Sequence, residues 1–401
     1  MKTIFFILLL LFTTVVTFAQ EFVSEGIKTA RIRQSEKDFS YPICQLGGAL
    51  ELQFDVLDDK YTDLIYSVRH CDCNFEPDDL SFSEFAEGFD FREIDSYENS
   101  FNTHQNFTHY TLRIPNNDLK LLISGNYIVT VYEDGDAEKP ILRKRFMVYD
   151  FADNSKLKAE VSRPFISEYS FDCQQVAVRL KTDVQTKYVK VFAMQNKDFS
   201  TMRELEVSGY APGEILYEKN DGNNLFKGGS EFEFFDGKDV HFRALGIDEI
   251  KYEYGLYSYK LSPFKPVDVS YSFQEDLNGA YYIKNDKGFS LDLEADYIKV
   301  LFRLKYDRYT ENKIMILGEA FDENDEMSFN SESGFWEKEV LLKQGLYNFQ
   351  FVEKTTAGEK NFLSGSWYNT ENDYFFAVYT TLLKDPGDRL MFVKTVNSVK
   401  K

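Results

Sequence analysis

The sequence predicts an all-β protein made of several β-sandwiches, and three observations support this. Apolar and polar residues alternate with a period of two in segments along the whole chain, as they do in half-buried strands. The 38 phenylalanines and 26 tyrosines favour strands, and no stretch keeps a helical period for more than about two turns. With 401 residues, the chain is too long for one hydrophobic core. We therefore expect three tandem sandwiches of the immunoglobulin-like or early-set kind.

A secretory signal peptide is expected at residues 1–19. Lys2 is followed by an apolar run over residues 4–16 and then by small residues that suit cleavage before Gln20. A membrane-spanning helix would need about 20 apolar residues, and this run is shorter. Because the first cysteine comes much later, a lipid anchor at the new N-terminus is not expected. We expect a chain that folds outside the cytosol and has no membrane span.

The charge balance argues against two classes of partner. The chain has 46 Lys and Arg against 66 Asp and Glu, which gives a net charge of −20. Such a surface repels the phosphates of nucleic acids and of anionic lipids. An apolar content of 43%, together with few prolines and glycines, excludes a disordered or collagen-like chain. We therefore expect a folded protein that binds no nucleic acid.

The first sandwich is expected at residues 20–155. Strict alternation over residues 50–56 predicts a half-buried strand. Residues 127–132 and 141–149 flank the turn sequence at residues 133–136, which predicts a β-hairpin.

One short helix is predicted within this first segment, at residues 79–87. Ser81 and Glu84 have the spacing of a capping box, in which each side chain satisfies a backbone N–H at the helix start. The apolar pattern ends soon afterwards, so we expect a single short helical element.

A second sandwich is expected at residues 156–266 and a third at residues 267–401. Two prolines mark the boundary between them. In the second segment, residues 252–261 alternate and are interpreted as one strand. In the third, residues 374–382 are interpreted as the strand that closes the domain.

Four cysteines could form disulfides or remain free. Outside the cytosol, Cys44, Cys71, Cys73 and Cys173 allow three pairings, and the sequence does not select one of them. The run from His70 to Cys73 (HCDC) is the only cluster of metal-binding residue types. No second spaced pair accompanies it, so we expect core or disulfide cysteines there and no metal site.

No catalytic site is expected. His104 and His109 could act as acid–base groups, but no nucleophile motif, H-E-x-x-H motif or phosphate-binding glycine loop accompanies them. Acidic clusters at residues 133–136 and 322–326 lack the glycine and glutamate positions of an EF-hand loop, and we interpret them as solvated turns. We therefore predict no catalytic, cofactor-binding or metal-binding residues and no cofactor.

Three aromatic residues leave a carbohydrate-binding function open. Trp336, Trp367 and Tyr368 could form a platform for a sugar ring, or they could be ordinary core residues. The order of segments in the third block is similar to that of starch- and glycogen-binding early-set sandwiches. This likeness supports the topology more than the ligand.

Five segments together carry a family resemblance. In order, they are residues 100–103 (SFNT), 125–136 (GNYIVTVYEDGD), 223–236 (NNLFKGGSEFEFFD), 276–283 (DLNGAYYI) and 365–379 (GSWYNTENDYFFAVY). With these segments, the chain resembles the type IX secretion system plug protein family of Bacteroidetes over nearly its whole mature length. Phe75, Ser230 and Glu233 depart from the Trp, Asn and Arg that the family pattern leads one to expect.

The resemblance implies a non-enzymatic component of a protein secretion system. Such a plug closes the periplasmic mouth of the giant outer-membrane translocon β-barrel while no cargo is passing. It implies a protein of the periplasm that is associated with the outer membrane and whose partner is that barrel. A periplasmic or surface carbohydrate-binding β-sandwich protein is the alternative, and an enzyme of unknown class is a third possibility.

Overall fold

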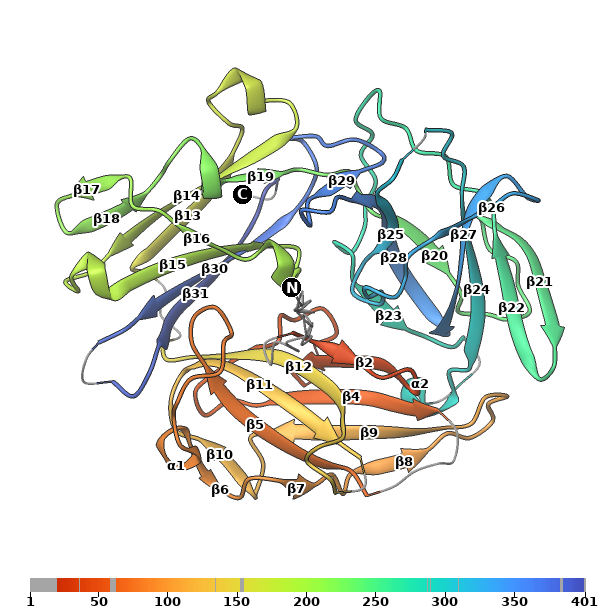
Figure 1. The fold of residues 1–401 in the computed structure, drawn as a ribbon, viewed down its shortest axis with the longest axis horizontal. Helices are drawn as coiled ribbons and strands as arrows, with labels where there is room; N and C mark the ends of the chain where they lie inside the picture. The colour runs from red at the N-terminus through yellow and green to blue at the C-terminus, as the bar shows by residue number, and fades with distance from the viewer. Residues whose placement is uncertain are drawn as a thin grey trace, which may run out of the picture.

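The computed structural model describes residues 20–399, except residues 36, 58–62, 134, 152–154, 287, 289, 309 and 383–384. The expected signal peptide at residues 1–19 lies outside the described residues, as does Asp134 of the expected hairpin turn. The described chain forms three β-sandwiches arranged around a common centre (Figure 1). The prediction of an all-β sandwich protein is confirmed.

The first sandwich, at the bottom of Figure 1, packs a six-stranded sheet against a four-stranded sheet. The larger sheet contains, in order, β1 (Phe22–Val23), β12 (Pro140–Tyr149), β11 (Gly125–Tyr132), β5 (Ile65–Cys71) and β7 (Arg92–Glu93), with β3 (Ile43–Gln45) parallel to β12. The smaller sheet contains β2 (Ile27–Arg33), β4 (Leu50–Leu57), β9 (Phe107–Ile114) and β8 (Tyr97–Asn99). A separate pair, β6 (Ala86–Gly88) and β10 (Leu119–Leu121), follows helix α1 (Phe82–Phe85).

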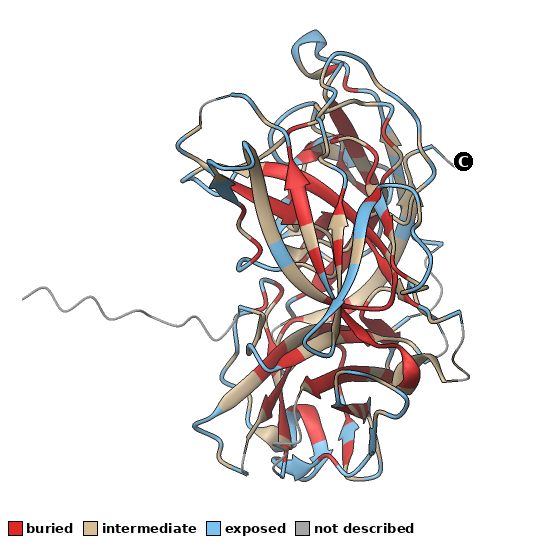
Figure 2. Cartoon of the chain, turned by 90° about the vertical axis from the view of Figure 1, so that its right-hand side faces the viewer, coloured by how far each residue is buried: buried red, intermediate tan, exposed pale blue. Residues whose placement is uncertain are grey.

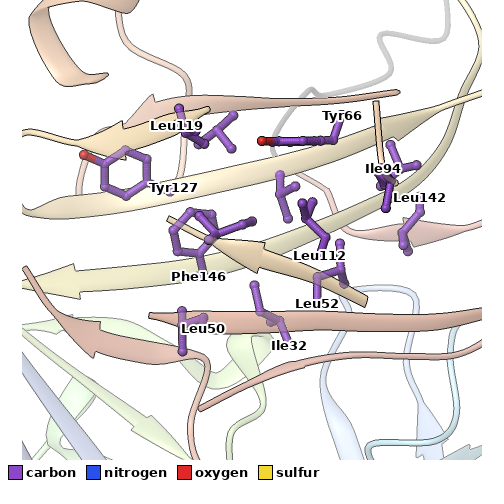
Figure 3. Packing of buried hydrophobic residues seen from close by; sticks show 14 of the residues in the cluster. Ile32, Leu50, Leu52, Tyr66, Ile94, Leu112, Leu119, Tyr127, Leu142 and Phe146 are labelled. Carbon is purple, nitrogen blue, oxygen red and sulfur yellow. The ribbon is translucent and has the colours of Figure 1, made fainter. Parts of the chain in front are cut away.

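The core of this sandwich fills the space between the two sheets. Leu50 and Leu52 of β4 are fully buried, and Tyr127 of β11 stacks on Phe146 of β12 with ring centres 5.2 Å apart (Figure 3). The predicted hairpin is the pair β11–β12, and the predicted helix is α1. Its capping box is present, since the Glu84 carboxylate accepts the backbone N–H of Ser81 at 2.8 Å.

The second sandwich contains a five-stranded and a four-stranded sheet. The first of these orders β13 (Leu157–Ser162), β14 (Cys173–Lys181), β18 (Glu214–Tyr217) and β17 (Gly209–Ala211), with β19 (Leu225–Lys227) along β14. The other orders β16 (Arg203–Leu205), β15 (Val189–Gln195), β30 (Asp373–Thr380) and β31 (Arg389–Asn397). Short 3₁₀ turns lie at η1 (Ser167–Tyr169), η2 (Thr186–Tyr188), η3 (Phe199–Thr201) and η4 (Gly222–Asn224).

The third sandwich contains two five-stranded sheets. In one, β28 (Gly345–Lys354) pairs with β20 (Glu233–Asp236), β23 (Tyr281–Ile283), β25 (Lys313–Leu317) and β29 (Lys360–Phe362). The other orders β21 (Ile247–Glu253), β22 (Leu256–Leu261), β24 (Tyr297–Leu304), β27 (Phe335–Lys343) and β26 (Ser328–Asn330), and helix α2 (Leu291–Glu294) precedes β24. Most of the buried core residues lie on strands, and Figure 2 shows the buried segments inside the molecule.

The strand pairings group the chain differently from the expected segments 156–266 and 267–401. Strand β22 pairs in parallel with β24, so residues 247–261 lie in the third sandwich. Strands β30 and β31, near the end of the chain, pair with β15 and complete the second sandwich. The reason is that alternation shows which face of a strand is buried, but it does not show which strand forms the hydrogen bonds.

The prediction of one strand at residues 252–261 is wrong. A tight turn at Tyr254 and Gly255, with φ of 53° and 83°, divides the segment into β21 and β22. A tyrosine in the left-handed region is uncommon, so a turn at this position was not expected from the residue types.

Candidate functional site at the junctions of the three sandwiches

A fourth buried cluster joins the first sandwich to the second. Phe75 and Met147 of the first sandwich pack with Phe192 of β15 and Tyr379 of β30. The Tyr379 hydroxyl also donates to Asn126 Oδ1 at 2.7 Å across the junction. All these side chains are buried, so this contact has the character of a protein core and holds the two sandwiches as one body.

The predicted His–Cys–Asp–Cys segment begins at the end of β5, beside this cluster. The ring of His70 is buried, its Nδ1 lies 2.5 Å from Asp78 Oδ2, and its ring meets Tyr127 edge-on at 5.0 Å. His70 is therefore a hydrogen-bonded core residue of the first sandwich, and the sequence prediction of core residues in this segment agrees with its position.

Cys73 belongs to a polar contact between the first and second sandwiches. Its N–H donates to Asp388 Oδ2 at 2.9 Å, and the Lys190 ammonium lies 3.3 Å from its sulfur. Asp72, Cys73 and Asp388 are the only potential metal ligands in the described part of the chain that form a group of three with ligand atoms within 4.8 Å of one another. Because the Lys190 cation already lies beside the sulfur, we interpret this group as an interdomain contact.

All four cysteines are free and buried. Burial raises the pKa of Cys44, Cys73 and Cys173 to about 12, which keeps these thiols protonated and unreactive near neutral pH. The sequence left open whether the cysteines form disulfides or remain free, and in the structure all four are free thiols.

The first and third sandwiches are joined by a buried ionic contact around Asp55 of β4. The Asp55 carboxylate accepts hydrogen bonds from His109 Nδ1 at 2.6 Å, the Tyr297 hydroxyl at 2.6 Å and Lys343 Nζ at 2.7 Å. Asp55 and His109 belong to the first sandwich, and Tyr297 and Lys343 to the third. Lys343 also lies 4.0 Å from the ring centre of Phe107.

Both charges of this pair are removed from solvent. The exposed fractions of the Asp55 and Lys343 side chains are 0% and 1%. Burial acts to raise the pKa of Asp55, but Lys343 and His109 together lower it below its ordinary value. His109, a candidate acid–base residue in the sequence, therefore has a clear structural partner. His104 lies apart from it and forms a 3.0 Å hydrogen bond with the Tyr252 hydroxyl.

A cleft of about 740 Å³ opens where the three sandwiches meet. Its walls come from β1 and β2 of the first sandwich, residues 195–201 of the second and residues 315–324 of the third. Lys360 of the third sandwich forms an ion pair with Asp198 of the second at this cleft. The described lining contains no histidine or cysteine.

Exposed aromatic side chains gather on a loop of the second sandwich. Phe165 is 89% exposed and Phe171 is 68% exposed. The guanidinium of Arg163 lies 5.1 Å from the ring centre of Phe171 and 4.3 Å from that of Tyr368, which ties this loop to residues 366–370. We call Phe165, Phe171 and Tyr368 the aromatic surface. Exposed apolar surfaces of this kind commonly mark contacts with partner proteins.

The three candidate sugar-binding aromatics do not form one platform. Trp336 lies on β27 and packs against Phe329 at 5.7 Å. Trp367 lies in the loop before β30, and its Nε1 donates to the Ser364 carbonyl at 3.2 Å. Only Tyr368 of the three belongs to the aromatic surface.

The acidic cluster at residues 322–326 is a turn in which both glutamates are ion-paired. Glu323 forms an ion pair with Lys354, and Glu326 forms one with Lys313, each at 2.6 Å. These lysines leave no unpaired acidic site for a cation at either glutamate.

No helix in the described residues is long and apolar enough to cross a membrane.

Three comparisons place the chain among known proteins. Residues 27–150 match the family model described as the type 9 secretion system plug protein 1st domain. The chain is also similar to a crystal structure of a hypothetical protein from Parabacteroides merdae ATCC 43184, with 28% sequence identity and a TM-score of 0.88 over 94% of this chain and 98% of that one. A search of curated proteins found no match.

Proposed function

We propose that this chain closes the periplasmic mouth of the outer-membrane translocon barrel, because residues 27–150 match the family model of the type 9 secretion system plug protein 1st domain. The family match of the first domain is the observation that carries this proposal. It agrees with the resemblance that the five segments indicated in the sequence. The partner is the barrel, and the role is to seal it while no cargo is passing.

The way in which the sandwiches are joined supports a sealing role. A plug must keep its shape while it blocks a wide opening, and flexible domains would leave gaps. Here an apolar cluster joins the first and second sandwiches, and the buried Asp55–Lys343 pair joins the first and third. These contacts favour one rigid body over three loosely linked domains.

The proposal places the protein in the periplasm, attached to the outer membrane through its partner. A signal peptide at residues 1–19 would deliver it there. We propose a non-enzymatic role, which the match of residues 27–150 to the plug protein family model supports.

The aromatic surface is our candidate for part of the contact with the barrel. A seal that must release needs an interface of moderate size, with a few apolar anchors inside a polar rim. Phe165 and Phe171 are apolar anchors of this kind, because they extend from a loop and their side chains are largely exposed.

The first test is an affinity pull-down of the tagged full-length protein from detergent-solubilised outer membranes, read by mass spectrometry. We expect one very large β-barrel at near-equal amount. A preparation without any barrel, from cells that make the translocon, would refute the plug role. Deletion of the gene should also make the outer membrane permeable to large antibiotics.

A pair of variants tests the contact surface separately. Phe165→Ser with Phe171→Ser should reduce recovery of the barrel, whereas Tyr210→Ser, which removes a similarly exposed aromatic from strand β17, should not. Equal recovery with both variants would exclude the aromatic surface and leave the plug role itself untouched. Binding of a glycan in place of a barrel would favour the carbohydrate-binding alternative.

A further inference from the structure

Two exposed phenylalanines lie at the edge of the first sandwich that faces away from the other two sandwiches. Phe89 is 63% exposed and Phe91 is 39% exposed, and both lie in the connection between β6 and β7. Figure 1 shows β6, β7 and β10 at this outer edge. We call residues 88–95 the outer segment. It is separate from the aromatic surface, which belongs to the second sandwich.

The backbone of the outer segment has an uncommon conformation. Gly88 has a φ of 119°, and a Cβ there would lie 2.0 Å from the Asp118 carbonyl oxygen. Phe91 has a φ of 57°, in the left-handed region that bulky side chains rarely adopt. Such a conformation persists only where the surrounding contacts enforce it, and positions of this kind are frequent at binding sites.

Two arginines hold the phenylalanine rings in place. Arg69 donates to Asp90 Oδ1 at 2.9 Å, and its guanidinium lies 5.5 Å from the ring centre of Phe91. Arg92 is likewise ion-paired with a carboxylate and lies 5.3 Å from the ring centre of Phe89. Aromatic rings and arginines are enriched at the centres of protein interfaces. Because the rings are already held in position, a partner that binds them loses little side-chain entropy.

The charge around the outer segment is negative. Residues 84–95 contain five acidic residues and one basic residue, Arg92. The neighbouring lysine and arginines are each paired with a carboxylate already. Glu93 and Asp95 are exposed and form no ion pair with another described residue. The surplus negative charge attracts cationic side chains and repels the phosphates of lipids and nucleic acids.

We propose that the outer segment binds a partner protein through a segment of that partner that is both basic and apolar. Phe89 is the apolar anchor of this interface, and Glu93 and Asp95 at its rim attract lysine or arginine side chains of the partner. Apolar anchors inside a charged rim give an interface its specificity and its rate of association. The proposal depends neither on the translocon role nor on the aromatic surface.

The test is photo-crosslinking in cells that make the full-length protein. Benzoylphenylalanine takes the place of Phe89, and after irradiation the partner peptide in the cross-linked product is identified by mass spectrometry. We expect one discrete product, whose partner peptide contains more Lys and Arg than Asp and Glu. The matched control carries the same photoreactive residue in place of Phe273 of the third sandwich, which is 65% exposed, and should not give this product.

The affinity for a synthetic peptide of the cross-linked partner segment tests the two parts of the interface. Phe89→Ser should weaken binding at least about tenfold, because it removes the apolar anchor. Glu93→Lys with Asp95→Lys should weaken binding by a similar factor and reduce its dependence on salt. Glu253→Lys with Glu332→Lys changes the net charge equally at exposed positions of the third sandwich. This control should bind within about twofold of the wild type.

Three results would overturn the proposal. The first is the absence of a discrete cross-linked product at position 89. The second is a partner peptide with at least as many acidic as basic residues. The third is an affinity that Phe89→Ser and the Glu93–Asp95 variant leave unchanged, or an equal loss of affinity in the Glu253–Glu332 control.

Discussion

Replacement of Lys343 by methionine should weaken the contact between the first and third sandwiches. The Lys343 ammonium lies 2.7 Å from Asp55 Oδ2, and both side chains are buried. Methionine keeps most of the apolar stem of lysine but carries no charge. The variant therefore leaves the Asp55 carboxylate buried without its cation, while the rest of the contact is largely retained.

The expected loss follows from the geometry of the pair. At an effective dielectric constant of 20, opposite unit charges 2.7 Å apart attract by about 6 kcal/mol, and desolvation offsets part of this. Breaking a buried pair by removing one partner commonly costs about 3–5 kcal/mol, since the other charge stays buried. Asp55 keeps the His109 and Tyr297 donors, so we expect a loss near the lower limit, about 3 kcal/mol.

The pH dependence of the wild type follows from the lowered pKa of Asp55. Burial acts to raise this pKa, but Lys343 and His109 lower it below the ordinary value of 3.8. A carboxyl with a lowered folded pKa stabilises the protein above its unfolded pKa, and this stabilisation is lost as the pH falls through the folded pKa. The wild type should therefore lose more stability below pH 3.8 than Lys343→Met does.

The assay is urea unfolding at neutral pH, together with hydrogen exchange of β4 and β27. The matched control is Lys299→Met, which breaks an exposed pair with Glu339 at 3.6 Å and should change the stability by less than about 1 kcal/mol. Adding Asp55→Asn to Lys343→Met should restore part of the loss, because no buried charge remains unpaired. Equal stabilities of Lys343→Met and Lys299→Met would refute the reasoning.

Three further predictions concern stability and reactivity. Gly228→Ala should destabilise the chain by about 1–3 kcal/mol in thermal unfolding, since a Cβ there would lie 1.9 Å from the Trp367 carbonyl oxygen, whereas Gly26→Ala meets no atom within 4 Å and should be neutral. All four cysteines should react slowly with Ellman's reagent in the native protein and rapidly in urea, and fast native labelling would contradict their burial. Burial, with the charges of Asp276 and Glu371, raises the pKa of Glu231, which lies between β19 and β20, to about 7, so wild-type stability should fall as the pH rises from 4.5 to 7. Glu231→Gln should lack this fall, and an unchanged pH profile of melting temperatures would argue against the raised pKa.

Individual strands were predictable because their signal is local. The alternation at residues 50–56 became β4, the hairpin at residues 127–149 became β11 and β12, and the capping box of Ser81 and Glu84 became α1. Each of these depends on residues a few positions apart, which a single sequence displays directly.

The junctions between sandwiches were not predictable from such patterns. Asp55 and Lys343 are 288 positions apart in the chain, and neither belongs to a motif. Glu231 and Glu371 lie in two of the five segments that carried the family resemblance, and the Glu371 N–H donates to Glu231 Oε1 where the second sandwich meets the third. Asn126 of a third segment contacts Tyr379 across the junction of the first and second sandwiches. These segments were therefore the one feature of the sequence that included the junction residues. The sequence did not show that these residues contact one another.

The sequence by itself determined the all-β class, the position of several strands and the resemblance to the plug family, because periodicity, turns and short motifs are properties of neighbouring residues. Only the tertiary structure decided which strands share a sheet, since every strand presents the same backbone N–H and C=O groups to any partner strand. It alone placed β30 and β31 in the second sandwich. It also brought together the buried Asp55–Lys343 pair, since only the folded chain shows which opposite charges are removed from water side by side.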